Sequence, residues 1–230
     1  MKRYGFLSIA LATALTFGCN TKSDKDVNAG NPPAGGAVGT AGSEDHNVSN
    51  GDKDFVKDVA SDGTAEVELG RMALDRAVNP DVKKFAQMMI DDHTKANQEL
   101  TSIATQYNIP VPSAPDDKHN DLRDKLAKYQ GADFDREYIN AMVDDHQDAL
   151  DKLGSRVDKD TLDKSKAEAK DASGRKVETK VEATSVMPEK SDNTTTMALN
   201  SWAAKTYPVV KAHLDQAKTL RDTVKKRMTN

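Results

Sequence analysis

The chain has 230 residues, of which 30% are charged and 5% are aromatic, and its formal net charge is -4. High charge with few aromatic residues predicts one compact domain accompanied by unfolded segments. The nearly balanced charge argues against nucleic acid as a partner, and the single cysteine excludes an internal disulfide framework.

Residues 1–18 predict an export signal peptide. Lys2 and Arg3 precede an apolar run over residues 4–17, which is too short to cross a bilayer as a mature helix. The string "LTFGC" resembles the lipobox of bacterial lipoproteins, in which the cysteine after a small residue carries the lipid. The resemblance implies that Cys19 becomes the lipid-modified N-terminus and attaches the protein to a membrane. Cleavage by ordinary signal peptidase, which leaves Cys19 free, is the alternative.

The residues after Cys19 predict the destination and the connection to the domain. Asn20 stands where lipoproteins retained in the inner membrane of well-studied Gram-negative bacteria typically have aspartate. We therefore expect the outer membrane, with the domain facing either the periplasm or the medium. Residues 19–52 are rich in Gly, Asn, Ala, Pro, Ser and charge, which predicts a disordered tether between the lipid and the domain.

Helical periodicity predicts an all-α domain over residues 53–228. Apolar spacing predicts long helices over residues 55–79, 81–107, 133–153 and 195–228, and a short connecting helix over residues 116–129. Gly63 predicts a kink or break in the first helix, and Pro208 predicts a bend in the last.

Residues 154–194 form a long charged insertion between the third and fourth long helices. They contain almost no large apolar residues, so they offer no apolar face that would pack a helix. We expect a mobile, low-complexity, solvated segment. Binding of a protein partner through residues 155–193 is the alternative.

Each long helix carries one ionisable residue at the centre of its apolar stripe. These residues are Glu66, His93, His146 and His213. An antiparallel hairpin would place Glu66 and His93 at a similar depth, because both are about equally far from the turn between their helices. The stripe around His213 includes Val209. Asp92 and Asp145 lie at the flank of their stripes, where they are better suited to support the histidines than to bind a ligand directly.

A layer of three imidazoles and one carboxylate permits three interpretations, of which a different proton-transfer or redox role is the third. The four side chains are a candidate ligand set for one divalent transition metal, with zinc, iron, manganese and copper all admissible. Alternatively, they form a satisfied polar core together with Tyr138 and buried water. Catalysis has no support, because the sequence contains no convincing nucleophile elbow, phosphate loop, zinc-finger pairing or catalytic carboxylate pair.

Four separated blocks resemble one bacterial envelope family. They read "EVELGRMALDRA", "VKKFAQMMIDDHTKANQEL", "FDREYINAMVDDHQDAL" and "WAAKTYPVVKAHLDQAKTL", and the similarity covers residues 54–153 and 197–220. The family is known as domain of unknown function 4142. The resemblance implies a ferritin-like antiparallel four-helix bundle, an outer-membrane location and no established activity. It also implies that the family's polar core residues fall at the four stripe positions given above.

The ferritin-like fold suggests a di-iron site, which the spacing opposes. Di-iron bundles use Glu-x-x-His pairs, whereas the residues three places before the histidines are Ile90, Val143 and Val210. Any metal site is therefore expected to be mononuclear. Met89 and Met142, one turn before their histidines, are interpreted as core residues, although thioethers beside imidazoles would suit Cu(I).

Taken together, these patterns predict a lipid-anchored envelope protein that acts as a non-catalytic helical binding or structural module. One alternative is a mononuclear metal-binding protein for storage, sensing or redox defence, built on the four stripe residues. The other is a partner-binding protein that uses the charged insertion. The sequence identifies no particular protein partner.

Overall fold

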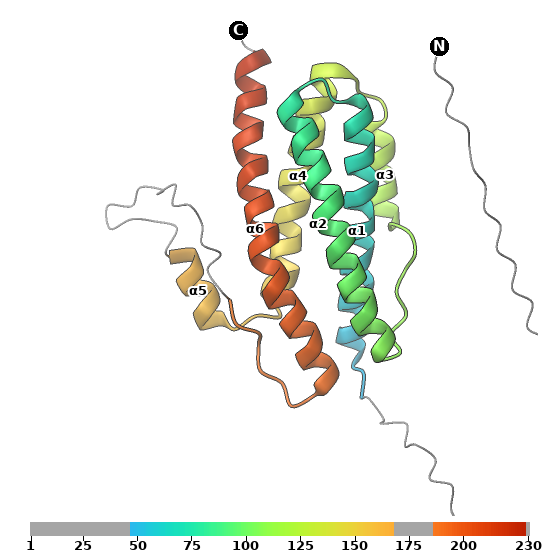
Figure 1. Cartoon of the computed structure of the whole chain (residues 1–230), viewed down its shortest axis with the longest axis vertical. Coiled ribbons are helices and arrows are strands. Elements are labelled where there is room, and N and C mark those ends of the chain that lie inside the picture. The colour runs from blue at the N-terminus through green and yellow to red at the C-terminus, as the bar shows by residue number, and fades with distance from the viewer. Residues whose placement is uncertain (1–46, 168–185, 229–230) are drawn as a thin grey trace, which may run out of the picture. The chain divides into compact units, whose positions relative to one another are not determined.

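A computed structural model describes residues 47–167 and 186–228, which belong to the compact unit Glu44–Asn230 (Figure 1). These residues form helices and no strand, so the predicted all-α class is confirmed for the part of the chain that is described. The helices are α1 (Asn50–Arg76), α2 (Pro80–Gln106), α3 (Asp117–Leu126), α4 (Gly131–Gly154), α5 (Lys159–Ala167) and α6 (Thr194–Met228). None of these helices combines the length and apolarity that a membrane crossing requires.

The four long helices α1, α2, α4 and α6 pack side by side around one apolar core. α1 packs mainly on α2, and α4 mainly on α6, while α2 also contacts α6 and α1 also contacts α4. Neighbouring helices run in opposite directions (Figure 1). The short helix α3 lies outside this group, against α1 and α4. Phe85, Met89, Tyr138, Met142 and Leu199 are fully buried between the helices, as helical apolar periodicity requires.

The turn between α1 and α2 is fixed by side chains. Asn79 caps α2 by accepting the Asp81 amide proton on Oδ1 at 3.0 Å, and Pro80 occupies the first turn, where no amide donor is needed. The buried Asp135 carboxylate of α4 accepts the Val78 and Asn79 amides at 3.1 and 2.9 Å. The turn is thereby joined to α4, and the α1–α2 pair is held in register with the rest of the core.

Two expectations about the helices need correction. α1 runs unbroken through Gly63. This glycine is buried against α2, and an added Cβ atom would collide with the Asn97 side chain, so its role is close helix packing. Val209 is 41% exposed instead of buried in the stripe of α6. α6 continues as a helix through Pro208, so the helix predicted over residues 195–228 is present as one element.

The two ends of the charged insertion are more ordered than expected. Val157, Leu162 and Val186 are buried in the common apolar core. The Asp158 amide donates to the Met187 carbonyl at 2.8 Å, and the Glu189 amide donates to the Arg156 carbonyl at 3.0 Å. The prediction of a segment with nothing to pack is therefore wrong for these ends, where single apolar residues dock without forming a stripe. The middle, 168–185, lies outside the described residues.

The N-terminal boundary also differs from the expectation. α1 begins at Asn50, inside the range expected for the tether, with Ser49 as its N-cap. Asp52 is buried, and its Oδ1 atom lies 2.6 Å from Arg156 Nη1 beside α4. Residues 1–46, which include the predicted signal peptide, Cys19 and most of the tether, lie outside the described residues.

Candidate metal centre

Three histidines from three helices meet inside the helical core. His93 comes from α2, His146 from α4 and His213 from α6. Their ring centroids are separated by 5.4 to 5.5 Å. One nitrogen from each ring lies within 4.8 Å of a nitrogen from each of the others. The structure therefore brings together three of the four residues that the sequence singled out, and we call these three the histidine cluster.

Two of the three rings are oriented by one hydrogen bond each. His146 Nδ1 lies 2.8 Å from the Met142 carbonyl oxygen, and His213 Nε2 lies 2.9 Å from Asp92 Oδ2. A carbonyl only accepts hydrogen bonds, so Nδ1 of His146 carries its proton. The Asp92 carboxylate assigns the proton of His213 to Nε2 in the same way. The remaining nitrogens, Nε2 of His146 and Nδ1 of His213, then present lone pairs.

These remaining nitrogens have no hydrogen-bond partner. His146 Nε2 and His213 Nδ1 are buried and unpartnered, and so is His93 Nε2, although the His93 side chain as a whole keeps partial exposure. A proton on His93 would satisfy at most one of the other two nitrogens at a time. A single cation among the rings would satisfy all of them.

The cluster is uncharged at neutral pH. Burial, reinforced by His146 and His213, lowers the pKa of His93 well below its usual value. Burial and the neighbouring His213 lower the pKa of His146 from 6.5 to about 3. Burial also lowers the pKa of His213, although the Asp92 hydrogen bond acts in the opposite direction. Three neutral imidazoles are the form in which histidine binds a metal.

Glu66 lies beside the cluster without joining it. Its Oε1 atom is 3.5 Å from His146 Nδ1, on the side of the ring that faces the Met142 carbonyl and away from the free Nε2. Oε2 of Glu66 is buried without a partner. Burial, with Asp145 and Asp62 nearby, raises the pKa of Glu66 well above its usual value. Glu66 therefore lies against the outer nitrogen of His146, and burial favours the neutral form of its carboxyl group.

The aspartates of the two repeated strings occupy different surroundings. Asp92 supports His213, as expected for a residue at the flank of its stripe. Asp145, its counterpart in the second string, lies 3.6 Å from Lys118 Nζ, and its Oδ2 atom is buried without a partner. Asp91 and Asp144 are exposed, as their position on the solvent side predicts.

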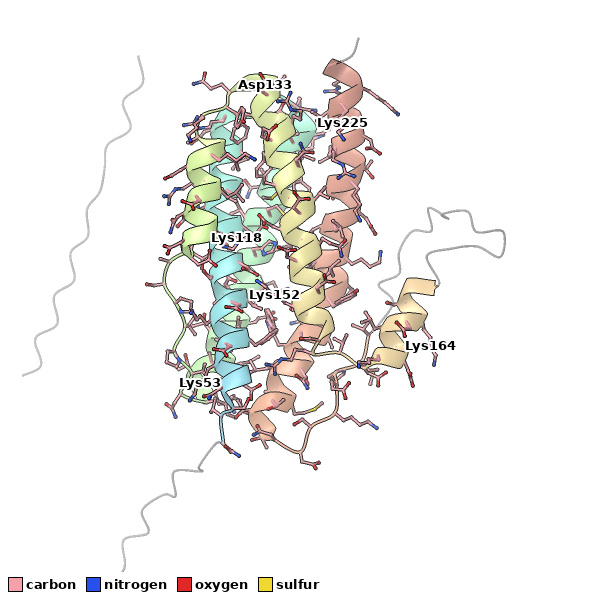
Figure 2. All side chains as sticks on the ribbon, turned by 180° about the vertical axis from the view of Figure 1, so that it is seen from behind. Lys53, Lys118, Asp133, Lys152, Lys164 and Lys225 are labelled. Carbon is pink, nitrogen blue, oxygen red and sulfur yellow. The ribbon has the colours of Figure 1, made fainter. Side chains whose placement is uncertain are left out.

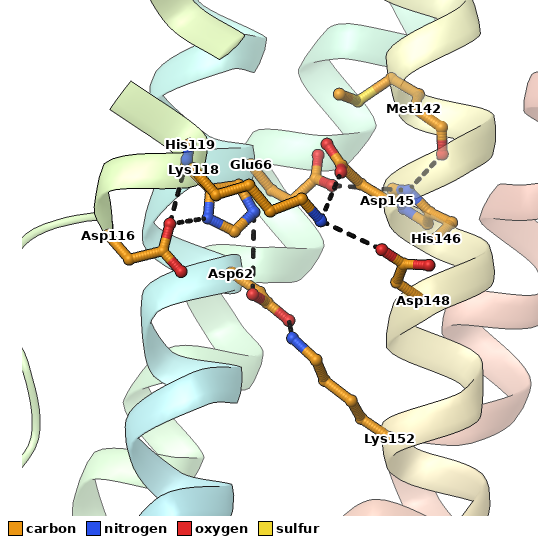
Figure 3. Close-up of polar contacts among 10 residues, drawn as sticks. All are labelled: Asp62, Glu66, Asp116, Lys118, His119, Met142, Asp145, His146, Asp148 and Lys152. Atoms are coloured by element: carbon orange, nitrogen blue, oxygen red, sulfur yellow. Dashed lines mark hydrogen bonds and ion pairs between the residues drawn. The ribbon is translucent and has the colours of Figure 1, made fainter. Parts of the chain in front are cut away.

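A second group of potential ligands lies on the outer side of α1. His119 of α3 is buried, with Nδ1 2.6 Å from Asp116 Oδ1 and Nε2 3.7 Å from Asp62 Oδ1 (Figure 3). The sequence did not predict this group, because the docking of a short helix onto α1 leaves no periodic signal. The same Asp116 Oδ1 atom also caps α3, because it accepts a hydrogen bond from the His119 backbone amide at 3.0 Å.

A family model described as "Domain of unknown function (DUF4142)" matches residues 37–173, which is more than half of the chain. No curated protein matches the chain. A solved structure described as "CopM in the Cu(II)-bound form" is similar at 21% sequence identity, covering 75% of this chain and 96% of that one, with a TM-score of 0.48. By its family match, this chain belongs to the family described as domain of unknown function DUF4142.

Proposed function

We propose that this protein binds one divalent transition metal ion through His93, His146 and His213. The observation that carries the proposal is a group of three imidazoles that each offer a nitrogen within 4.8 Å of the others and that each have a buried nitrogen without a partner. Each buried nitrogen without a partner costs about 1–3 kcal/mol. A bound cation removes all three penalties together, whereas a polar core would need donors that the surrounding described residues do not supply.

The outer contacts of the cluster support the same proposal. Metal-binding histidines almost always donate their other N–H group to a carboxylate or a backbone carbonyl, which fixes the ring and raises its basicity. His146 donates to the Met142 carbonyl and His213 donates to Asp92. These bonds leave the inward nitrogen of each ring available, as a metal site requires.

The donor set narrows the choice among zinc, iron, manganese and copper. Imidazole suits zinc, copper and iron, whereas manganese prefers oxygen ligands and is the weakest fit. Three neutral imidazoles leave at least one coordination position open for water or a small ligand. The site is mononuclear, because Ile90, Val143 and Val210 stand where a di-iron bundle carries carboxylates.

The wider setting of this function is also a proposal. The four long helices form a ferritin-like antiparallel bundle, and a lipid on Cys19 anchors it to the bacterial envelope, at the outer membrane. The binding role is non-catalytic and serves metal storage, sensing or redox defence. Support for the anchor comes from the signal and the string "LTFGC".

Metal analysis tests the proposal directly. Protein purified without a histidine tag is stripped with a chelator, dialysed against zinc, copper(II) or iron(II), and analysed for bound metal. We expect one ion per chain, and a loss of stoichiometric binding in His146→Leu. Asp144→Asn is the matched control, because Asp144 is exposed and precedes His146 by two residues. Sub-stoichiometric binding of every metal, or equal binding by His146→Leu, contradicts the proposal.

A further inference from the structure

A small polar cavity joins the histidine cluster to the protein surface. It has a volume of about 20 Å³, room for about one water molecule. His93, Glu66 and His146 line its inner part, and Lys118 and Asp148 line its outer part. The inner residues come from three of the long helices, whereas Lys118 comes from α3. The cavity thus leads from the exposed charged groups of Lys118 and Asp148 to His93 and His146, two of the three residues of the histidine cluster.

Lys118 lies at the mouth of this cavity, bound to carboxylates of α4. Its Nζ atom is 3.0 Å from Asp148 Oδ2 and 3.6 Å from Asp145 Oδ1 (Figure 3). The Lys118 side chain is 58% exposed, whereas that of Asp145 is 10% exposed. Because the ammonium group is exposed and its stem is flexible, it can leave these carboxylates at little cost.

A second ammonium group is paired with Asp62, another of the acids that line the cavity. Lys152 Nζ lies 2.6 Å from Asp62 Oδ2. Lys118 and Lys152 lie on the same face of the molecule, over α1, α3 and α4 (Figure 2). Both lysines therefore form ion pairs with carboxylates that would otherwise attract a divalent cation.

The alternative approach to the cluster is less suited to a cation. A cavity of about 30 Å³ reaches His93 from another side, and its walls are mainly apolar, with Val59, Leu153, Trp202 and Val210 among them and Asp62, Asn97 and Thr206 as the polar members. A divalent cation that leaves water needs oxygen or nitrogen partners along its path, and a mainly apolar wall supplies few. The polar cavity supplies the carboxylates of Asp148, Asp145 and Asp62, then the carboxyl oxygens of Glu66, and then imidazoles.

We propose that the metal ion reaches the histidine cluster through the polar cavity, and that Lys118 controls the rate of its uptake. This inference rests on the proposed function. The carboxylates of Asp145 and Asp148 attract the ion, and the Lys118 ammonium both neutralises them and repels it. Uptake requires Lys118 to swing away, after which the ion takes its place on the carboxylates and passes inward. Lys118 is thus a positioning residue for uptake and contributes no ligand to the final site.

The rate of metal binding tests this inference. Removing one positive charge from the mouth of a charged cleft is expected to raise the association rate constant about tenfold at low ionic strength, and less at high salt. Lys118→Ala of the full chain is therefore compared with the unaltered chain, by stopped-flow mixing of the metal-free protein with zinc held by a chromophoric chelator. Asp148→Asn should slow binding several-fold, because it removes an attracting carboxylate.

Lys125→Ala is the matched control for this experiment. Lys125 belongs to the same helix, its side chain is 60% exposed, and its Nζ atom faces Glu137 at 3.7 Å, away from the cavity. We expect Lys125→Ala to bind zinc at the unaltered rate. An association rate of Lys118→Ala within about twofold of the unaltered chain, or an equal acceleration by Lys125→Ala, overturns the inference while the stoichiometry of one ion stands. Absence of zinc binding by the unaltered chain overturns the proposed function as well.

Discussion

Replacing His146 with leucine should stabilise the metal-free protein, which is an unusual outcome for a fully buried residue. His146 is 1% exposed, and its Nε2 atom lies in the core without a partner. Leucine has a similar volume, so the substitution removes the unpartnered nitrogen and leaves little empty space. Relief of that nitrogen contributes about 1–3 kcal/mol.

The loss that opposes this gain is smaller. The bond from His146 Nδ1 to the Met142 carbonyl disappears, which costs about 0.5–1.5 kcal/mol. No new unpartnered group results, because the Met142 carbonyl keeps the helical bond from the amide four residues later. The free energy of unfolding in chelator should therefore rise by about 1 kcal/mol, which raises Tm by about 2–4 °C for a domain of this size.

When metal is present, the unaltered protein should become more stable than His146→Leu. A metal concentration about 100 times Kd stabilises the unaltered protein by about 2.7 kcal/mol, whereas His146→Leu gains little. Urea and thermal unfolding, followed by circular dichroism with chelator and then with zinc, measure both differences. A fall of about 2 kcal/mol or more for His146→Leu in chelator would refute this reasoning, because it would mean that the ring is a satisfied part of a polar core.

Tyr138 provides a matched comparison in the same core. Its hydroxyl group is buried without a partner, but it does not belong to the histidine cluster. Tyr138→Phe should raise the free energy of unfolding by about 1 kcal/mol and leave the metal stoichiometry and Kd unchanged. The same unfolding experiments, with a zinc titration, test both expectations. A lost zinc site in Tyr138→Phe would contradict the assignment of the ligands.

Two further predictions concern Asp92 and pH. Asp92→Asn should weaken zinc binding about 10- to 100-fold, measured by competition with a chelator, because it weakens the bond that orients His213; unchanged Kd would contradict that role. The pKa values of His93, His146 and His213 are lowered on folding, so their stabilising contribution is complete above about pH 6.5 and is lost as pH falls below it. Each histidine changes the free energy of unfolding by up to about 1.4 kcal/mol per pH unit in that window. The pKa of Glu66 is raised, so its stabilising contribution is complete below about pH 4.5 and is lost as pH rises, which offsets part of the histidine slope. Urea unfolding of the metal-free protein at pH 7, 6 and 5 measures the slope, and equal stability at all three values would contradict it.

The helices and their inward histidines could be predicted because both follow from short-range patterns. Apolar spacing fixes which face of a helix is buried, and prolines and caps fix where helices end. His146 and His213 are buried as predicted, whereas His93, which lies next to them, is half-buried. The direction of a stripe does not fix which atoms meet. Glu66 points to the core as expected, yet it contacts the outer nitrogen of His146.

Features that depend on docking could not be predicted. Val157 and Leu162 are isolated apolar residues in a charged segment, and only the completed core shows where they bind. Lys118 and His119 acquire their surroundings from the placement of α3 against α1 and α4, which periodicity does not encode. Val209 was misassigned because it lies at the edge of its stripe, where a small rotation of the helix exposes a side chain.

X-ray absorption at the zinc edge tests the central claim most directly. The account predicts that protein loaded with one zinc ion shows three imidazole nitrogens at about 2.0–2.1 Å, with the remaining position filled by a light atom. His213→Leu should reduce the imidazole count by one. A zinc environment composed mainly of oxygen ligands, or one unchanged in His213→Leu, would contradict the assignment of the ion to the histidine cluster.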